Sequence, residues 1–141
     1  MSDAISIVAI TGVAVIAYLT MSYGLARRMR FHVRTKLEPQ EQMIYEAYVL
    51  RVGPFWAGLR DGVISVTNRR VLLGVWNLPF VWPTIDFLNL SDLGALEDLK
   101  YSMRIRVGDR TIFVMPKANE LWPISGSKTK LLVNALEAAK A

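Results

Sequence analysis

The residue types that usually carry catalysis are few in this chain and form no recognisable constellation. His32 is the only histidine, and the absence of cysteine excludes thiolate catalysis, disulfides and cysteine-ligated zinc. Five carboxylates fall at expected turns and strand ends, where such groups are ordinarily solvated or cap an element: Asp86, Asp92, Glu97, Asp98 and Asp109. The sequence has no phosphate-binding loop, two-histidine metal helix or nucleophile elbow. It therefore predicts a protein that is not an enzyme, with no catalytic residue, metal site or cofactor.

The first long segment of the chain is apolar. Residues 5–26 carry no charged side chain, and as a helix they would extend about 33 Å, close to the roughly 30 Å hydrocarbon core of a bilayer. A helix pairs its backbone N–H and C=O groups internally, as lipid requires. A secretory signal would start with basic residues, whereas this chain starts Met1-Ser2-Asp3. We predict that residues 1–26 form a single, uncleaved transmembrane helix.

A basic segment follows directly. Residues 27–36 are the predicted juxtamembrane connector, and they contain Arg27, Arg28, Arg30, Arg34 and Lys36. The positive-inside rule then places the N-terminus outside an inner or cell membrane and the C-terminal domain in the cytoplasm. The same cations could also bind anionic lipid headgroups, at about 1 kcal/mol per basic residue.

The distribution of charge argues against a nucleic-acid partner. Residues 1–26 contribute −1, the connector contributes +5, and from residue 37 onward twelve Lys or Arg oppose eleven Asp or Glu, which gives the net charge of +5. A nucleic-acid binder carries its basic excess on the folded domain. Here the excess lies at the expected membrane border, so lipids and membrane proteins are the partners that the charge pattern favours.

Small residues in the apolar segment are candidates for helix–helix packing. Thr20 with Gly24, and Ser22 with Ala26, are spaced four apart, and small residues let a second helix approach closely. Gly12 lies in the same segment. Small residues are frequent in membrane helices in any case, so two alternatives stay open: a plain anchor, or association with another integral subunit or a second copy of the chain.

The rest of the chain reads as short antiparallel strands and one helix. Residues 62–67 and 70–75 flank a short polar break, which predicts a β-hairpin with Ile64 and Val66 on one side and Val63, Ser65 and Thr67 on the other. Further strands are predicted over 43–51 and 84–90, and a second hairpin is predicted over 101–107 and 111–115 with its turn at Gly108-Asp109-Arg110. From Lys128 the apolar spacing becomes helical, with Ser125 or Ser127 as the N-cap.

The predicted hairpin carries a family resemblance. The run from Gly62 to Leu73 resembles the central hairpin of GRAM and bacterial pleckstrin-homology-like (PH-like) domains: glycine, apolar alternation, threonine, one or two residues, arginine, then apolar residues. Residues 37–41 and 90–93 also resemble parts of that pattern. The resemblance implies a PH-like domain over residues 37–141, of the α+β class and mainly β: an antiparallel β-barrel or bent sandwich capped by a C-terminal helix.

The resemblance also implies a domain that binds lipids or proteins and usually catalyses nothing. The inositol-phosphate-binding subset of PH domains has a basic cluster across the first loop, but this chain offers only Arg51 and Arg60 there. In such a barrel the loop after the first strand and the loop after the third strand open at the same end. In this chain the first of these loops follows Gly53 and the second is predicted over residues 76–83, and both are aromatic. Their candidate docking residues are Phe55, Trp56, Trp76, Phe80 and Trp82. These side chains either dock a membrane or protein partner or fold back over the core.

These observations predict a non-catalytic, membrane-anchored interaction module. The first hypothesis is an accessory or stabilising subunit of a larger membrane complex, such as an energy-converting or transport assembly. The alternative is a lipid-binding or lipid-sensing protein at the membrane surface.

Overall fold

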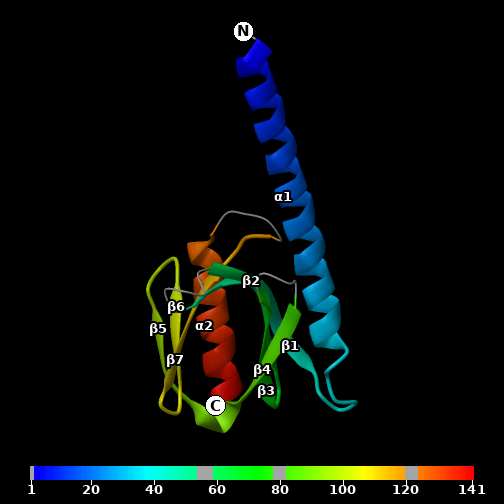
Figure 1. Ribbon diagram of the computed structural model, residues 1–141. Helices are drawn as coiled ribbons and strands as arrows, with labels where there is room; N and C mark the ends of the chain where they lie inside the picture. The colour runs from blue at the N-terminus through cyan, green and yellow to red at the C-terminus, as the bar shows by residue number, and fades with distance from the viewer. Residues whose placement is uncertain (1, 54–58, 78–81, 120–123) are drawn as a thin grey trace.

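The computed structural model describes residues 2–53, 59–77, 82–119 and 124–141. Within these ranges the chain forms two α-helices, seven strands and one short 3₁₀ turn (Figure 1). The helices are α1 (Ser2–Arg34) and α2 (Gly126–Lys140), and the 3₁₀ turn is η1 (Leu90–Asp92). The strands are β1 (Met43–Val52), β2 (Leu59–Thr67), β3 (Arg70–Asn77), β4 (Trp82–Asn89), β5 (Leu93–Asp98), β6 (Met103–Val107) and β7 (Arg110–Pro116).

The seven described strands join in one antiparallel sheet in the order β4-β3-β2-β1-β7-β6-β5. The sheet does not close, because β4 and β5 remain its edges. It bends around α2, which lies along the hollow between the β1–β4 half and the β5–β7 half (Figure 1). This architecture confirms the predicted α+β class, with a mainly β domain and a C-terminal helix as its cap.

Both predicted hairpins are present. Ile64 pairs with Leu73 across β2 and β3, and Ile105 pairs with Ile112 across β6 and β7. The β6–β7 turn contains Gly108 at φ +60°, a backbone conformation that favours glycine. One difference concerns residues 76–83, which were predicted as a loop: β3 continues to Asn77 and β4 begins at Trp82.

The inner core lies between the concave face of the sheet and α2. The side chain of Ser125 caps α2 by accepting the backbone N–H of Lys128 at 3.2 Å, as its sequence position predicted. Leu132 and Leu136 of α2 are fully buried in this core. Alternate strand residues point inward to meet them, among them Val49, Ile64, Val66, Leu73, Met103, Ile105 and Val114.

α1 extends beyond the predicted transmembrane segment. It continues without a break through Arg34, so most of the predicted connector is helical. Four residues at helical spacing are buried along one face of the C-terminal part of α1, and the first two lie within the predicted transmembrane segment: Ser22, Ala26, Met29 and Val33. Met29 and Val33 form a second, outer core with Val63 and Leu72 on the convex face of β2 and β3. The central hairpin is therefore apolar on both faces, with α2 beneath it and α1 above it.

Close approach of α1 depends on Gly74 in β3. A Cβ atom at this position would lie 2.6 Å from Sδ of Met29 and 2.7 Å from Cγ2 of Val33. Both distances are shorter than van der Waals contact, so a side chain at residue 74 forces Met29 and Val33 to shift and strains their packing on the sheet. The absence of a side chain here lets the helix rest on the sheet.

We expect the substitution Gly74→Ala to weaken the docking of α1 by about 1–3 kcal/mol, the usual cost of overpacking. The matched control is Gly94→Ala, because a Cβ at Gly94 meets its nearest atom at an ordinary 3.5 Å. The chain has no cysteine, so a single Ala26→Cys probe reports exposure of the docked face without removing either side chain that meets residue 74. Thiol labelling in mild detergent should accelerate in the Gly74→Ala background only. Equal rates in both backgrounds would contradict the contact.

Candidate membrane-facing site

The N-terminal part of α1 projects away from the domain (Figure 1). We call residues 2–21 the free stretch, because every side chain in it is exposed. These 20 residues extend about 30 Å, which is the thickness of a bilayer's hydrocarbon core. By length and composition α1 is a helix that could cross a membrane. Ile5, Val8 and Ile10 are each about 70% exposed, so the free stretch presents a continuous apolar surface.

The four arginines of α1 that follow the free stretch divide into two groups. Arg30 and Arg34 both form ion pairs with Glu46 of β1, and Arg34 Nη2 lies 3.1 Å from its Oε1. Arg27 and Arg28 form no ion pair with any carboxylate among the described residues. Arg27 instead donates to the Tyr23 hydroxyl at 3.0 Å, and its guanidinium carbon lies 5.6 Å from that ring's centroid. Two cations therefore hold the helix to the domain, and two remain available to a partner.

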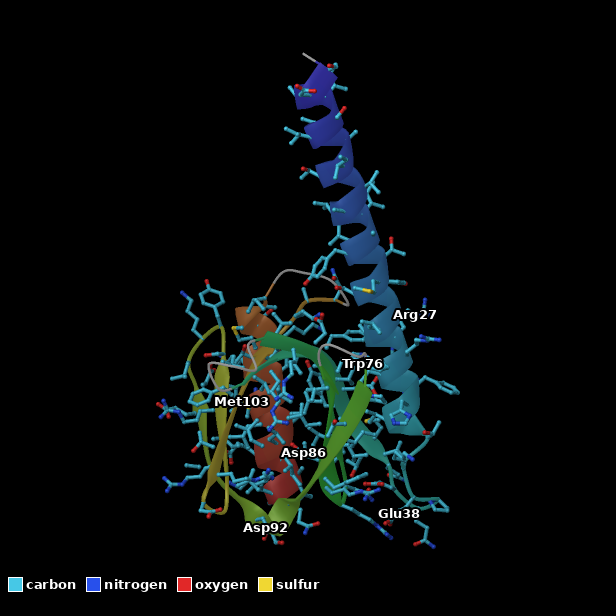
Figure 2. All side chains as sticks on the ribbon, viewed as in Figure 1. Arg27, Glu38, Trp76, Asp86, Asp92 and Met103 are labelled. Carbon is cyan, nitrogen blue, oxygen red and sulfur yellow. The ribbon has the colours of Figure 1, made fainter. Side chains whose placement is uncertain are left out.

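Trp76 joins the edge of the domain to α1. Its indole Nε1 donates to the backbone carbonyl of Leu25 at 2.7 Å. Figure 2 shows Trp76 beside α1, near the level of Arg27 on the helix. Since Leu25 lies about one turn beyond the free stretch, this end of β3 lies close to it. By their pairing registers the end of β1 and the start of β2 meet here too.

A groove of about 450 Å³ lies between α1 and the β3–β4 edge. Its lining comes from Arg27, Arg28, Phe31 and His32 of α1, from Thr35 just beyond the helix, and from Trp76 and Pro83 of the sheet. Its walls are predominantly apolar, and Phe31 is 71% exposed beside it. A large exposed aromatic side chain flanked by unpaired arginines is typical of an interaction surface.

A second polar contact fixes the chain between α1 and β1. The buried carboxylate of Glu41 accepts Thr67 Oγ1 at 2.6 Å and Arg70 Nε at 3.0 Å. Arg70 Nη2 also donates to the carbonyl of Lys36 at 2.9 Å, just beyond the end of α1. Burial acts to raise the pKa of Glu41, but the hydrogen bonds from Arg70 and Thr67 outweigh it, so the pKa lies below its usual range.

One of the two arginines at the position of the basic cluster of inositol-phosphate-binding PH domains is paired with a carboxylate. Arg51 Nη1 of β1 lies 2.7 Å from Oδ2 of Asp86 in β4. Arg60 pairs with Arg51 in the β1–β2 register. Burial, and then repulsion from Arg51, lower the pKa of Arg60, while the nearby Asp86 acts in the opposite direction. The described part of the chain also holds no group of three His, Asp or Glu side chains that could bind a metal.

The structure reaches only some of the predicted docking residues. Phe55, Trp56 and Phe80 lie outside the described residues, and so does the side chain of Trp82. Trp76 is half-buried against the outer core and contacts α1 within the chain. Docking through the other four aromatic side chains therefore stays a prediction.

The predicted helix-packing residues lie in different environments. Ser22 is only 7% exposed, on the buried face of α1 with Ala26. Thr20 is exposed, and a Cβ added at Gly12 or Gly24 would meet no atom within 4 Å. Ser22 thus belongs to the contact with the chain's own domain, whereas Gly12, Thr20 and Gly24 leave room for another helix.

Three contacts that position the domain were not predicted from the sequence: Met29 and Val33 on the sheet, Glu46 with Arg30 and Arg34, and Glu41 with Arg70. One signal was available. Ser22, Ala26, Met29 and Val33 recur at spacings of four, three and four, which indicates a buried helix face that runs through the basic segment.

No protein-family model matches the sequence, and no curated protein matches it. Solved structures do resemble the fold. The hSac2 domain of the human phosphoinositide phosphatase Sac2 aligns with a TM-score of 0.58 at 12% identity, over 81% of this chain and 79% of that one. The DH/PH domain of human ARHGEF11, in a complex with RhoA and its inhibitor, aligns with a TM-score of 0.53 at 11% identity over 71% of this chain. The linker-DH/PH domains of p115-RhoGEF align with a TM-score of 0.55 at 7% identity over 79% of this chain.

The fold is PH-like. At these identities the likeness extends to the fold alone. This chain covers only 29% and 32% of the two DH/PH chains, so it corresponds to a fraction of each. The predicted PH-like architecture is confirmed, whereas the narrower resemblance to GRAM domains stays a prediction.

The Glu41 contact makes a stability prediction. We expect Glu41→Gln to lower the free energy of unfolding by about 2 kcal/mol at pH 7, because Arg70 and Thr67 lose charge-assisted hydrogen bonds. A carboxyl group with a depressed pKa stabilises the fold above its unfolded value of about 4.3, and that contribution is lost as the pH falls through the folded-state pKa. Urea unfolding in mild detergent between pH 7 and 3 should therefore show a flatter acid limb for Glu41→Gln than for wild type.

Glu38→Gln is the matched control. Glu38 lies just beyond the C-terminal end of α1 (Figure 2), and its ion pair with Arg69 at 2.8 Å is about half exposed on both sides. Such pairs contribute little, so this variant should follow wild type. Parallel acid limbs for wild type and Glu41→Gln would show that Glu41 does not stabilise the fold as proposed.

Proposed function

We propose that this chain is a non-catalytic interaction module that α1 anchors in an inner or cell membrane, with its PH-like domain on the cytoplasmic side. One observation carries the proposal: α1 is exposed and apolar over the 20 residues of the free stretch and docked on the sheet from Ser22 to Val33. In water the free stretch would be an aggregation-prone surface. In lipid, the helix pairs its backbone groups internally and the acyl chains solvate its apolar side chains.

The docked helix gives the domain a defined orientation. Because α1 has no break between the free stretch and Arg34, a flexible linker does not separate anchor and domain. Trp76 and the ends of β1 and β3 then lie toward the bilayer, while the C-terminal end of α1 lies away from it. A module held in this way presents fixed surfaces to its neighbours, which supports a role in assembly rather than in capture of a distant ligand.

The first candidate role is an accessory or stabilising subunit of a larger membrane complex. α1 offers open positions at Gly12 and Thr20 in the free stretch, and at Gly24 just beyond it, for contact with other membrane helices. The described residues bring no catalytic or metal-binding group together, and small anchored subunits without chemistry usually serve assembly. The type of assembly, energy-converting or transport, follows from analogy alone.

The second candidate role is lipid binding at the membrane surface. Arg27 and Arg28 favour it, because no described carboxylate pairs with either and both follow the free stretch by less than two turns. Basic residues in this position attract anionic headgroups.

The membrane topology can be tested with two cysteine substitutions in the otherwise cysteine-free chain. Ser2→Cys lies at the start of α1, and Asp109→Cys lies in the exposed β6–β7 turn. We expect a membrane-impermeant maleimide to label residue 2 in intact cells and residue 109 only after the membrane is opened. The reverse pattern would invert the proposed orientation, and release of the protein by alkaline extraction would remove the anchor.

Purification of the full chain from its native membranes in mild detergent tests the accessory role. We expect integral membrane proteins to accompany it in stoichiometric amounts. A lone monomer in the same detergent would contradict the accessory role and favour lipid binding. Alkaline extraction of the same membranes serves as a control, since it reports anchoring independently of any partner.

A further inference from the structure

A second face of α1 is largely exposed from Ile10 to Phe31, and Thr35 continues it just beyond the end of the helix. Eight positions at alternating spacings of four and three make up this face, which we call the seam: Ile10, Ala14, Ala17, Met21, Gly24, Arg28, Phe31 and Thr35. Seven of them are exposed, and Gly24 is half-buried. The spacing is that of the a and d positions of a heptad, which keeps one stripe facing a neighbouring helix. The seam is separate from the docked face of Ser22, Ala26, Met29 and Val33.

Two hollows lie on the seam. Ile10, Ala14 and Ala17 belong to a concave apolar surface of about 390 Å³ on the free stretch, together with Ala9 and Val13. Arg28, Phe31 and Thr35 belong to the groove beside Trp76 and Pro83. Apolar contact surface therefore continues from the free stretch into the segment beyond it, along one side of one helix.

The charge on the seam changes where the free stretch ends. From Ile10 to Gly24 the seam carries no polar side chain. Arg28 is its next position, and Arg27 lies beside it. A partner that fits must be apolar over the same length and must carry negative charge at the level of these arginines. A second copy of the chain does not fit, because both copies would share one topology and place Arg28 opposite Arg28, and like charges across an interface are costly.

We propose that the seam binds the membrane-spanning helix of a different protein, one that continues past the bilayer and carries an Asp or Glu at the level of Arg28. The partner helix packs against Ile10, Ala17 and Gly24 inside the membrane. Its carboxylate pairs with Arg28, and an apolar side chain one turn further enters the groove against Phe31 and Trp76. This inference deepens the proposed accessory role and rests on it.

Site-specific photo-crosslinking of the full chain in its native membranes tests the proposal. A benzophenone amino acid replaces Ile10 or Phe31 on the seam, and in a control it replaces Phe87, an exposed phenylalanine of β4. We expect both seam positions, but not residue 87, to crosslink to the same protein. The crosslinked peptide should belong to a membrane-spanning helix with an Asp or Glu just beyond its cytoplasmic end.

Two variants probe the seam itself, each with a matched control. Gly24→Leu fills the seam, whereas Thr11→Leu changes an exposed side chain on the side of α1 that carries Ser22, three turns further along. Arg28→Glu reverses a seam charge, whereas Arg106→Glu reverses an exposed charge on β6. We expect at least a tenfold loss of crosslinking at residue 31 from Gly24→Leu and from Arg28→Glu, with the two controls unchanged.

Several results would overturn the inference. These are a crosslinked homodimer, a crosslink to lipid alone, a partner without a carboxylate at that level, or equal yields in all four variants. Failure here is distinguishable from failure of the accessory role. If stoichiometric partners co-purify while the seam variants crosslink like wild type, only the seam is wrong. If the chain purifies alone, the accessory role fails first.

Discussion

The docking of α1 on the convex face of β2 and β3 is the contact on which the rest of the molecule depends. It exists because Gly74 has no side chain and because Met29 and Val33 fill the space above it. The contact makes the long apolar helix an element of the domain, and it fixes the orientation of the bent sheet relative to that helix. Without it, the apolar convex face of the hairpin would be exposed to water, at a cost of about 25 cal/mol per Å².

The polar contacts around this interface fix its position along α1. Trp76 holds the backbone at Leu25, Glu46 holds Arg30 and Arg34, and Arg70 joins the carbonyl of Lys36 to the buried carboxylate of Glu41. The threonine and arginine of the PH-like hairpin pattern thereby acquire a physical role here. Thr67 and Arg70 at the β2–β3 turn bind Glu41 in the segment before β1. In this chain, these two residues of the pattern therefore hold the hairpin turn to the segment that enters the domain.

Local periodicity predicted most of the fold. Alternation of polar and apolar residues predicted the strands of both hairpins, and helical spacing after a serine cap predicted α2. These elements could be predicted because the residues that specify each of them lie close together in the sequence. The contacts that orient α1 could not be predicted in this way. Arg70 and Glu41 are 29 residues apart, Trp76 and Leu25 are 51 apart, and the acceptor on Leu25 is a backbone carbonyl that leaves no trace in the sequence. The extension of α1 to Arg34 was obscured because five cations suggested a connector.

The arginines of this segment point to different sides of α1. Arg30 projects toward the domain with the docked face and is neutralised by Glu46, while Arg28 lies on the seam with Phe31, and Arg27 beside it. A basic segment that only set membrane topology would have no reason to divide in this way, since that role depends on the number of charges and not on their direction. The division follows if the same two turns of α1 must hold the domain on one side and meet a partner on the other. A partner bound on the seam would then contact α1, the same helix that orients the PH-like domain. The partner and the domain would therefore keep a fixed position relative to each other.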